Sequence, residues 1–260
     1  MTDRAYFLAQ CSNAIYESPE RLGAWFAALP DWSWEPEDLI AHEETSTLSL
    51  LALNRSANEL LICFKGSHEL RDWLRSLTDS ELVPWAHPAG ECLVNAGFSG
   101  AWASVRAPIL ARLETLLGRL DPERDATIHL TGHSLGGALA TLAAADLIEA
   151  LALSAARRRG LSVCTFGAPA VGDQRFAEFY ASHVHRLLLA DRHYVAADDP
   201  VDAWLNEALE SPLARWLIDG TYARLADLIK LPASEYLNGH TMENYIALLA
   251  APAADDQGPR

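Results

Sequence analysis

The sequence predicts a single α/β domain with a mostly parallel central sheet and helices on both faces. The chain has 260 residues, half of them hydrophobic, which suits one large domain with a continuous core. From residue 98 onward, helix-like and strand-like patterns alternate, as in parallel sheets built with crossover helices. No linker-like stretch divides the chain, so we expect one domain over residues 1–250 and a flexible tail over 251–260.

The elements are expected in a definite order along the chain. Two helices open it, over 4–17 and 19–29, and the second has Ser18 as its cap and Pro19 in its first turn. Two strand-like runs, STLSLLALN and ELLICF, are separated by a short polar loop, which predicts a hairpin. A variable segment over 68–92 follows. The remaining elements are predicted as helices over 98–118, 136–152 and 173–183 and strands over 126–131, 161–166 and 186–196.

Charge and composition exclude several classes of partner. The formal net charge of −15 disfavours nucleic acid and anionic lipid, so we expect no nucleic-acid partner, whereas neutral substrates remain open. No stretch has the length and apolarity of a transmembrane segment. No signal peptide is visible, and Cys63 and Cys164 lie in strand-like runs typical of buried thiols, while pairing of Cys11 with Cys92 stays open. These features favour the cytoplasm, unless a leader has been removed.

The stretch LTGHSLGGAL, residues 130–139, carries the chemistry. It joins a short apolar strand to a strong helix former, and the pattern G-x-S-x-G at such a junction is typical of a nucleophile elbow. Gly132 and Gly136 supply the small neighbours that the strained serine turn requires, with His133 beside Ser134. A glycine-rich turn with an incidental serine is the alternative, and a phosphate-binding loop is disfavoured because neither the Walker lysine nor the G-x-G-x-x-G pattern is present.

A serine nucleophile needs a histidine base and a carboxylate, in the chain order Ser, Asp or Glu, His. Four histidines follow Ser134, namely His183, His185, His193 and His240. The first two fall in a helix-to-strand junction, and His193 precedes the candidate acids. His240 lies in a loop just before an apolar helix, where a base can reach the top of the sheet, so it is favoured.

Asp198 and Asp199 compete for the role of the acid, with Asp191 and Asp202 as weaker candidates. The pair follows directly on a predicted strand, at the carboxyl edge where sites of such sheets form. Because adjacent side chains of an extended chain point in opposite directions, only one of the two can face His240.

Several stretches together resemble the class 3 lipases, the family of the fungal triacylglycerol lipases and feruloyl esterases. GHSLGGALA is similar to the elbow of that family. The other similar stretches occur in the family's order between about residues 60 and 246: FKGSHELRDWL, VNAGFSGAW, TFGAPAVGDQRFAEF, DDPV and GHTMENYI, the last with the H-x-x-E-x-Y pattern of His240, Glu243 and Tyr245.

The resemblance implies an α/β-hydrolase fold and a triad of Ser134, Asp199 and His240. The family's acid motif aligns at Asp199, although Pro200 and Asp202 depart from the usual residues there. It also implies two oxyanion donors. One is the backbone N–H of Leu135, and the other is Ser67 at the end of LLICFKGS, unless Ser67 is a simple turn residue. Asn95 replaces a family histidine whose role is structural.

Two apolar segments are candidates for the substrate wall. Leu70, Trp73 and Leu74 fall on one helical face, in the segment that is a mobile lid in the fungal lipases; a short fixed helix is the alternative. Residues 203–230 are predicted as two helices, and Trp204 and Trp216 line either an acyl-binding wall or plain core.

The sequence thus predicts a serine ester hydrolase that acts on lipid-like esters through an acyl-enzyme. No metal or organic cofactor is expected, because the sequence lacks their motifs. Phospholipase A1 and aryl esterase activities remain open within this class, since the pocket decides them. A binding protein on a hydrolase scaffold is the alternative from another class.

Overall fold

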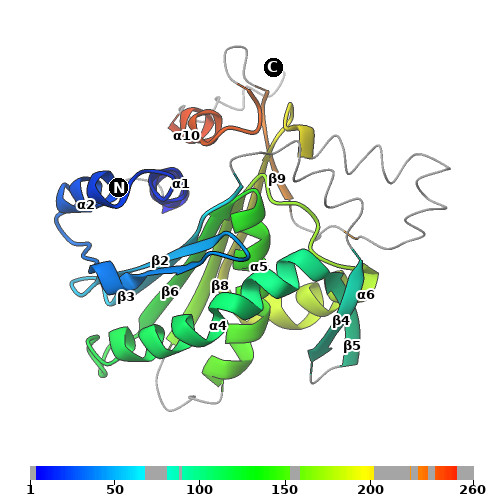
Figure 1. Cartoon of the computed structure of the whole chain (residues 1–260), viewed down its shortest axis with the longest axis horizontal. Helices are drawn as coiled ribbons and strands as arrows, with labels where there is room; N and C mark the ends of the chain where they lie inside the picture. The colour runs from blue at the N-terminus through cyan, green and yellow to red at the C-terminus, as the bar shows by residue number, and fades with distance from the viewer. Residues whose placement is uncertain are drawn as a thin grey trace, which may run out of the picture.

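The computed structural model describes residues 4–67, 81–87, 90–152, 159–201, 223, 228–233 and 238–250. Its centre is a seven-stranded sheet in the order β1-β2-β3-β6-β7-β8-β9 (Figure 1). The strands β1, β2 and β3 pair antiparallel, and all pairs from β3 to β9 are parallel. The predicted mostly parallel sheet is therefore confirmed. The strands are β1 (Leu39–His42), β2 (Thr47–Asn54), β3 (Glu59–Phe64), β6 (Ala126–His133), β7 (Arg159–Phe166), β8 (Leu188–Ala196) and β9 (Leu228–Leu231).

Helices cover both faces of this sheet, as the alternating pattern predicted (Figure 1). One face packs against α1 (Arg4–Ala14), α2 (Pro19–Ala27) and α10 (Met242–Ala250). The other face packs against α4 (Ala96–Leu117), α5 (Leu135–Ala152) and α6 (Gln174–Phe179), followed by the short π-helix η2 (Tyr180–Val184) and α7 (His185–Leu187). Two hydrophobic cores result, one on each face of the sheet. The carboxyl ends of the parallel strands form one edge of this sheet.

Local sequence signals account for several boundaries. The Ser18 hydroxyl accepts a hydrogen bond from the Arg21 N–H and caps α2, as predicted. The β2–β3 hairpin closes through Asn58, whose φ of +62° is in the left-handed region that asparagine tolerates. Asn95, which departs from the family pattern, caps α4 by accepting from the Phe98 N–H at 3.1 Å. Its role is therefore structural.

The structure corrects part of the predicted element order. Residues 228–230, the end of the segment predicted as two helices, belong instead to β9, because their backbone pairs with β8 at the edge of the sheet. The variable segment contains a hairpin of β4 (Leu82–His87) and β5 (Gly90–Asn95). The strand β1 and the 3₁₀ turn η1 (Pro36–Asp38) were not predicted, since such short elements carry little periodicity.

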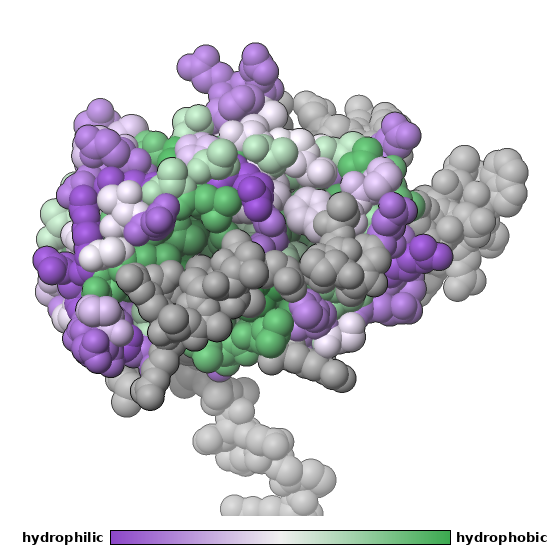
Figure 2. Space-filling view, turned by 90° about the horizontal axis from the view of Figure 1, so that it is seen from below, coloured by the Kyte–Doolittle hydropathy of each residue, from purple (hydrophilic) through white to green (hydrophobic). Residues whose placement is uncertain are grey.

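The described surface is mixed in polarity. In the face shown in Figure 2, hydrophilic residues dominate the rim, and a hydrophobic patch lies nearer the centre. Among the described residues, the exposed large hydrophobic side chains are Leu93, Leu187, Leu189 and Ile229. Three of these four belong to β8, β9 or the residue before β8, at one edge of the sheet. Within the described ranges, no helix has the length and apolarity that crossing a membrane requires.

Candidate active site

Ser134 occupies the turn between β6 and α5 in the conformation of a nucleophile elbow. Its φ is +56°, in the left-handed region that a non-glycine residue rarely adopts. Gly132 and Gly136 make this turn possible. A Cβ on Gly132 would lie 2.3 Å from the Gly136 carbonyl, and a Cβ on Gly136 would lie 2.1 Å from the Phe64 carbonyl oxygen. The two glycines therefore act as the sequence predicted: they let β3 and α5 approach the turn closely.

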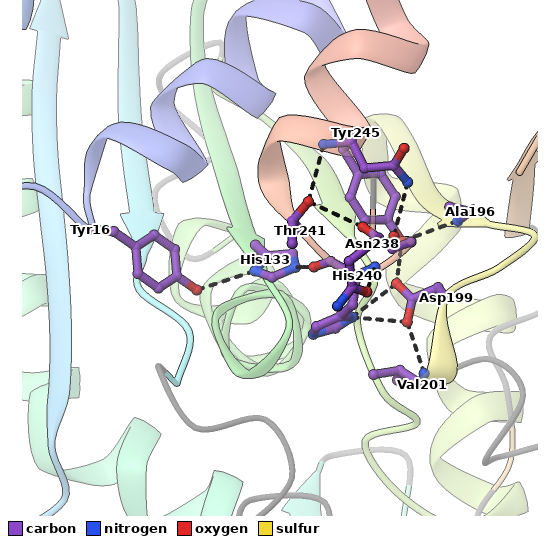
Figure 3. Close-up of polar contacts among 11 residues, drawn as sticks. Tyr16, His133, Ala196, Asp199, Val201, Asn238, His240, Thr241 and Tyr245 are labelled. Atoms are coloured by element: carbon purple, nitrogen blue, oxygen red, sulfur yellow. Dashed lines mark hydrogen bonds and ion pairs between the residues drawn. The ribbon is translucent and has the colours of Figure 1, made fainter. Parts of the chain in front are cut away.

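Asp199 and His240 form a buried acid–base pair (Figure 3). Both carboxylate oxygens of Asp199 lie 2.9 Å from Nδ1 of His240. The same carboxylate accepts from the Val201 N–H at 2.8 Å and from the Tyr245 hydroxyl at 2.6 Å. Since a carboxylate only accepts, neutral His240 carries its proton on Nδ1 and has its lone pair on Nε2.

The base and the elbow meet at the same edge of the sheet. The Ser134 N–H donates to the Phe166 carbonyl at 2.9 Å, and a Cβ on the next residue, Gly167, would lie 3.1 Å from His240 Nδ1. The ring of His133 lies beside that of His240, with centroids 4.5 Å apart. His133 of the turn and Gly167, next to the residue that accepts from the Ser134 N–H, thus both lie close to His240. Its Nε2 is buried and makes no hydrogen bond within the described part of the chain, so it is available to accept a proton.

Of the two candidate acids, only Asp199 is placed against His240. Asp199 is fully buried and faces His240, whereas Asp198 is exposed, which fits the opposite directions expected of adjacent side chains. Asp191 lies elsewhere, between His185 Nδ1 at 2.8 Å and His193 Nε2 at 2.9 Å. His193 is held in that separate cluster. Asp202 lies outside the described residues.

Of the two expected oxyanion donors, Leu135 directly follows Ser134, and Ser67 follows Gly66, which packs on the elbow. Leu135 is the first residue of α5, so its N–H belongs to the helix's first turn, where donors lack intrahelical partners. Gly66 packs directly on the elbow, since a Cβ there would lie 3.3 Å from Ser134 Cβ and 2.5 Å from the His133 carbonyl oxygen. Ser67 is the next residue. The predicted donor Ser67 thus directly follows, in the chain, a residue that contacts the nucleophile turn.

Three side chains of the site have contacts that sequence reasoning did not assign. Tyr245 donates to Asp199 and accepts from the Ala196 N–H at 3.1 Å; burial and the nearby Asp199 charge raise the pKa of its hydroxyl, which keeps it a donor. His133 lies within hydrogen-bond distance of the His240 carbonyl, at 2.6 Å, and of the Tyr16 hydroxyl, at 3.2 Å. Desolvation, followed by the His240 charge, lowers the pKa of His133 to about 3, so this ring is neutral. The H-x-x-E-x-Y pattern contained Tyr245, but nothing local marked Tyr16.

The residues of the predicted substrate wall lie outside the described ranges: Leu70, Trp73, Leu74, Trp204 and Trp216. Among the residues that are described, no group of three or more His, Cys, Asp or Glu side chains is arranged to hold a metal ion.

Comparison with known proteins gives consistent results. Residues 61–204 match the family described as lipase (class 3). A lipase of Rhizomucor miehei is 32% identical over 171 residues, which are 59% of this chain and 44% of that protein. The secreted mono- and diacylglycerol lipase A of Penicillium cyclopium is 27% identical over 160 residues, 60% of this chain and 46% of that protein. The chain thus spans less than half the length of these relatives.

The fold also matches solved structures. The structure of Rhizomucor miehei triacylglyceride lipase superposes with a TM-score of 0.64 at 22% identity, covering 87% of this chain and 78% of that one. The α/β-hydrolase fold implied by the sequence is therefore confirmed.

The prediction of a cytoplasmic protein is wrong. Relatives of this chain are named as secreted lipases, the Penicillium protein among them, and they point to secretion. The prediction rested partly on the cysteines, and all four are buried thiols that form no disulfide. Burial raises the pKa of the Cys63 thiol to about 12 and that of Cys92 to about 11, and such thiols resist oxidation in any compartment. Their pattern therefore carried no information about location.

Proposed function

The chain belongs to the class 3 lipase family, and on that premise we propose that it hydrolyses the carboxylic ester bonds of acylglycerols or similar lipids. One observation carries the proposal. Ser134 is in a strained turn at the start of α5, and the ring of its neighbour His133 lies against His240, whose Nδ1 is fixed by a fully buried carboxylate. This combination is what a serine nucleophile requires for its activation.

In the proposed mechanism, the Oγ of Ser134 attacks the ester carbonyl carbon while its proton passes to Nε2 of His240. Asp199 holds the ring in the required tautomer and stabilises the imidazolium. The N–H of Leu135 and the backbone N–H and hydroxyl of Ser67 donate to the oxyanion. The tetrahedral intermediate then collapses, and the imidazolium gives its proton to the departing alcohol. Water attacks the acyl-enzyme, again with His240 as the base, and releases the fatty acid and Ser134.

The names of the relatives support acylglycerols as the substrate class. One is called a lipase, and the other a mono- and diacylglycerol lipase. The net charge of −15 also suits a neutral ester better than an anionic phospholipid.

The test combines a covalent probe with substrate series. We expect a fluorophosphonate to label the wild type but not Ser134→Ala, and the variant to lose about 10⁶-fold in kcat. Mono-, di- and triacylglycerol emulsions, compared with phospholipid vesicles, then define the substrate. An unlabelled wild type that hydrolyses none of these esters would refute the proposal and favour a binding protein on the same scaffold.

A further inference from the structure

We propose that Tyr16 is a positioning residue that, with His133, sets the spacing between the loop carrying Ser67 and the loop carrying His240. The inference rests on the proposed function, because it assigns Ser67 and His240 their roles in ester hydrolysis. Tyr16 lies in the turn after α1, more than a hundred residues from any member of the proposed triad (Figure 3).

One packing contact and two hydrogen bonds link the two loops. The Tyr16 hydroxyl packs directly on Gly66, the residue before Ser67. The Tyr16 hydroxyl lies 3.2 Å from His133 Nδ1, and His133 Nε2 lies 2.6 Å from the His240 carbonyl oxygen. The connection therefore begins beside Ser67 and ends on the backbone of the proposed base.

The direction of each hydrogen bond follows from the chemistry. A carbonyl oxygen only accepts, so His133 carries a proton on Nε2. Because His133 is buried and neutral, its Nδ1 has a lone pair and accepts from the Tyr16 hydroxyl. The hydroxyl proton then points to His133, and the proton on Nε2 of His133 points to the His240 carbonyl, which gives both hydrogen bonds a defined direction.

The packing leaves little room for another arrangement. A Cβ on Gly66 would lie 2.3 Å from the Tyr16 hydroxyl oxygen and 2.5 Å from the His133 carbonyl oxygen. The Lys65 ammonium also lies over the Tyr16 ring, 5.6 Å from its centroid. Gly66 is thus enclosed by Tyr16 and the elbow. Removal of the hydroxyl takes away this contact and frees the loop to shift, which moves Ser67 relative to the developing oxyanion.

The first experiment separates positioning from general stability. Tyr16→Phe keeps the ring and its packing and removes only the hydroxyl. We expect kcat for p-nitrophenyl esters to fall about tenfold, with KM within about twofold of the wild type, because displaced oxyanion donors affect the transition state more than substrate binding. Circular dichroism and a thermal melt establish that the variant is folded.

Tyr180→Phe is the matched control. Tyr180 is a buried tyrosine on the opposite face of the sheet, and its hydroxyl donates to Asp191 at 3.3 Å. We expect this variant to lose stability without a change in kcat. An unchanged kcat in Tyr16→Phe, or an equal fall in both variants, would overturn the proposal.

A double-mutant cycle tests the route through the Ser67 loop. If Tyr16 acts on the oxyanion donors, the fold-decrease in kcat that Tyr16→Phe causes is at least about threefold smaller in a Ser67→Ala background than in the wild type. Additive effects of the two substitutions on kcat would refute the route. A Ser67→Ala variant with an unchanged kcat would refute it as well. Failure of the proposed function has a different signature, since the wild type itself would then neither hydrolyse esters nor react with the fluorophosphonate.

Discussion

His133 makes the protein less stable in acid by an amount that follows from its burial. Its pKa is lowered from 6.5 to about 3 in the folded state, whereas the unfolded chain binds this proton near pH 6.5. Between these two values the unfolded state holds more protons, so the free energy of unfolding falls as the pH falls. The loss begins near pH 6.5 and levels off below about pH 3.

Between pH 7 and pH 4.5, the linkage relation gives a decrease of about 2.5 kcal/mol in the free energy of unfolding from His133 alone. His133→Gln provides the comparison, because glutamine does not titrate and can still donate a hydrogen bond to the His240 carbonyl. Other groups, such as the Asp191 cluster, contribute equally to both proteins.

Urea unfolding at the two pH values measures the difference directly. The wild type is expected to lose about 2.5 kcal/mol more than His133→Gln between pH 7 and pH 4.5, whatever the baseline stability of the variant. The same pH dependence in both proteins would show that His133 protonates normally in the folded state, and the tautomer assigned to the Tyr16–His133 connection would then be wrong.

Two further changes test the site, and a third tests the buried ion pair between Asp38 of η1 and Arg112 of α4. Asp199→Asn is expected to lower kcat by about 10⁴-fold with little effect on KM, because the amide disfavours the required tautomer of the base; a steady-state assay that finds near-normal turnover would exclude Asp199 as the acid. Gly136→Ala places a methyl group 2.1 Å from the Phe64 carbonyl oxygen and is expected to cost about 3 kcal/mol or more in denaturant unfolding, so a neutral result would contradict the close packing. Arg112→Met leaves the Asp38 carboxylate, 2% exposed, without its cationic partner, for an expected loss of about 3 kcal/mol that disappears when Asp38 is also replaced by Leu.

The parts of the site that were predictable have local causes. The elbow could be found from the sequence because the steric needs of one strained serine fix the residues two positions away on either side. The choice between Asp198 and Asp199 was narrowed by the alternation of side chains along an extended segment, and the structure shows Asp199 buried as the family alignment implied.

The parts that were missed depend on contacts between distant segments. Residues 228–230 have a pattern that suits a helix, but an open edge of β8 pairs with them and makes them a strand. Tyr16 contacts His133 across 117 positions, and no local pattern distinguishes it from an ordinary helix-end tyrosine. The cytoplasmic prediction relied partly on the spacing of the cysteines in the chain. What protects these thiols from oxidation is their burial in the fold, which the spacing does not reveal.

The packing of α1 against α10 and β6 has a consequence for how activity is gained during folding. The parallel strands bring Ser134 and Asp199 to one edge, but the base arrives with α10, and Tyr16 arrives with the turn that ends α1. In a refolding experiment, ester cleavage would therefore lag behind the recovery of strand signal. The appearance of turnover would then report when α1 and α10 dock on each other.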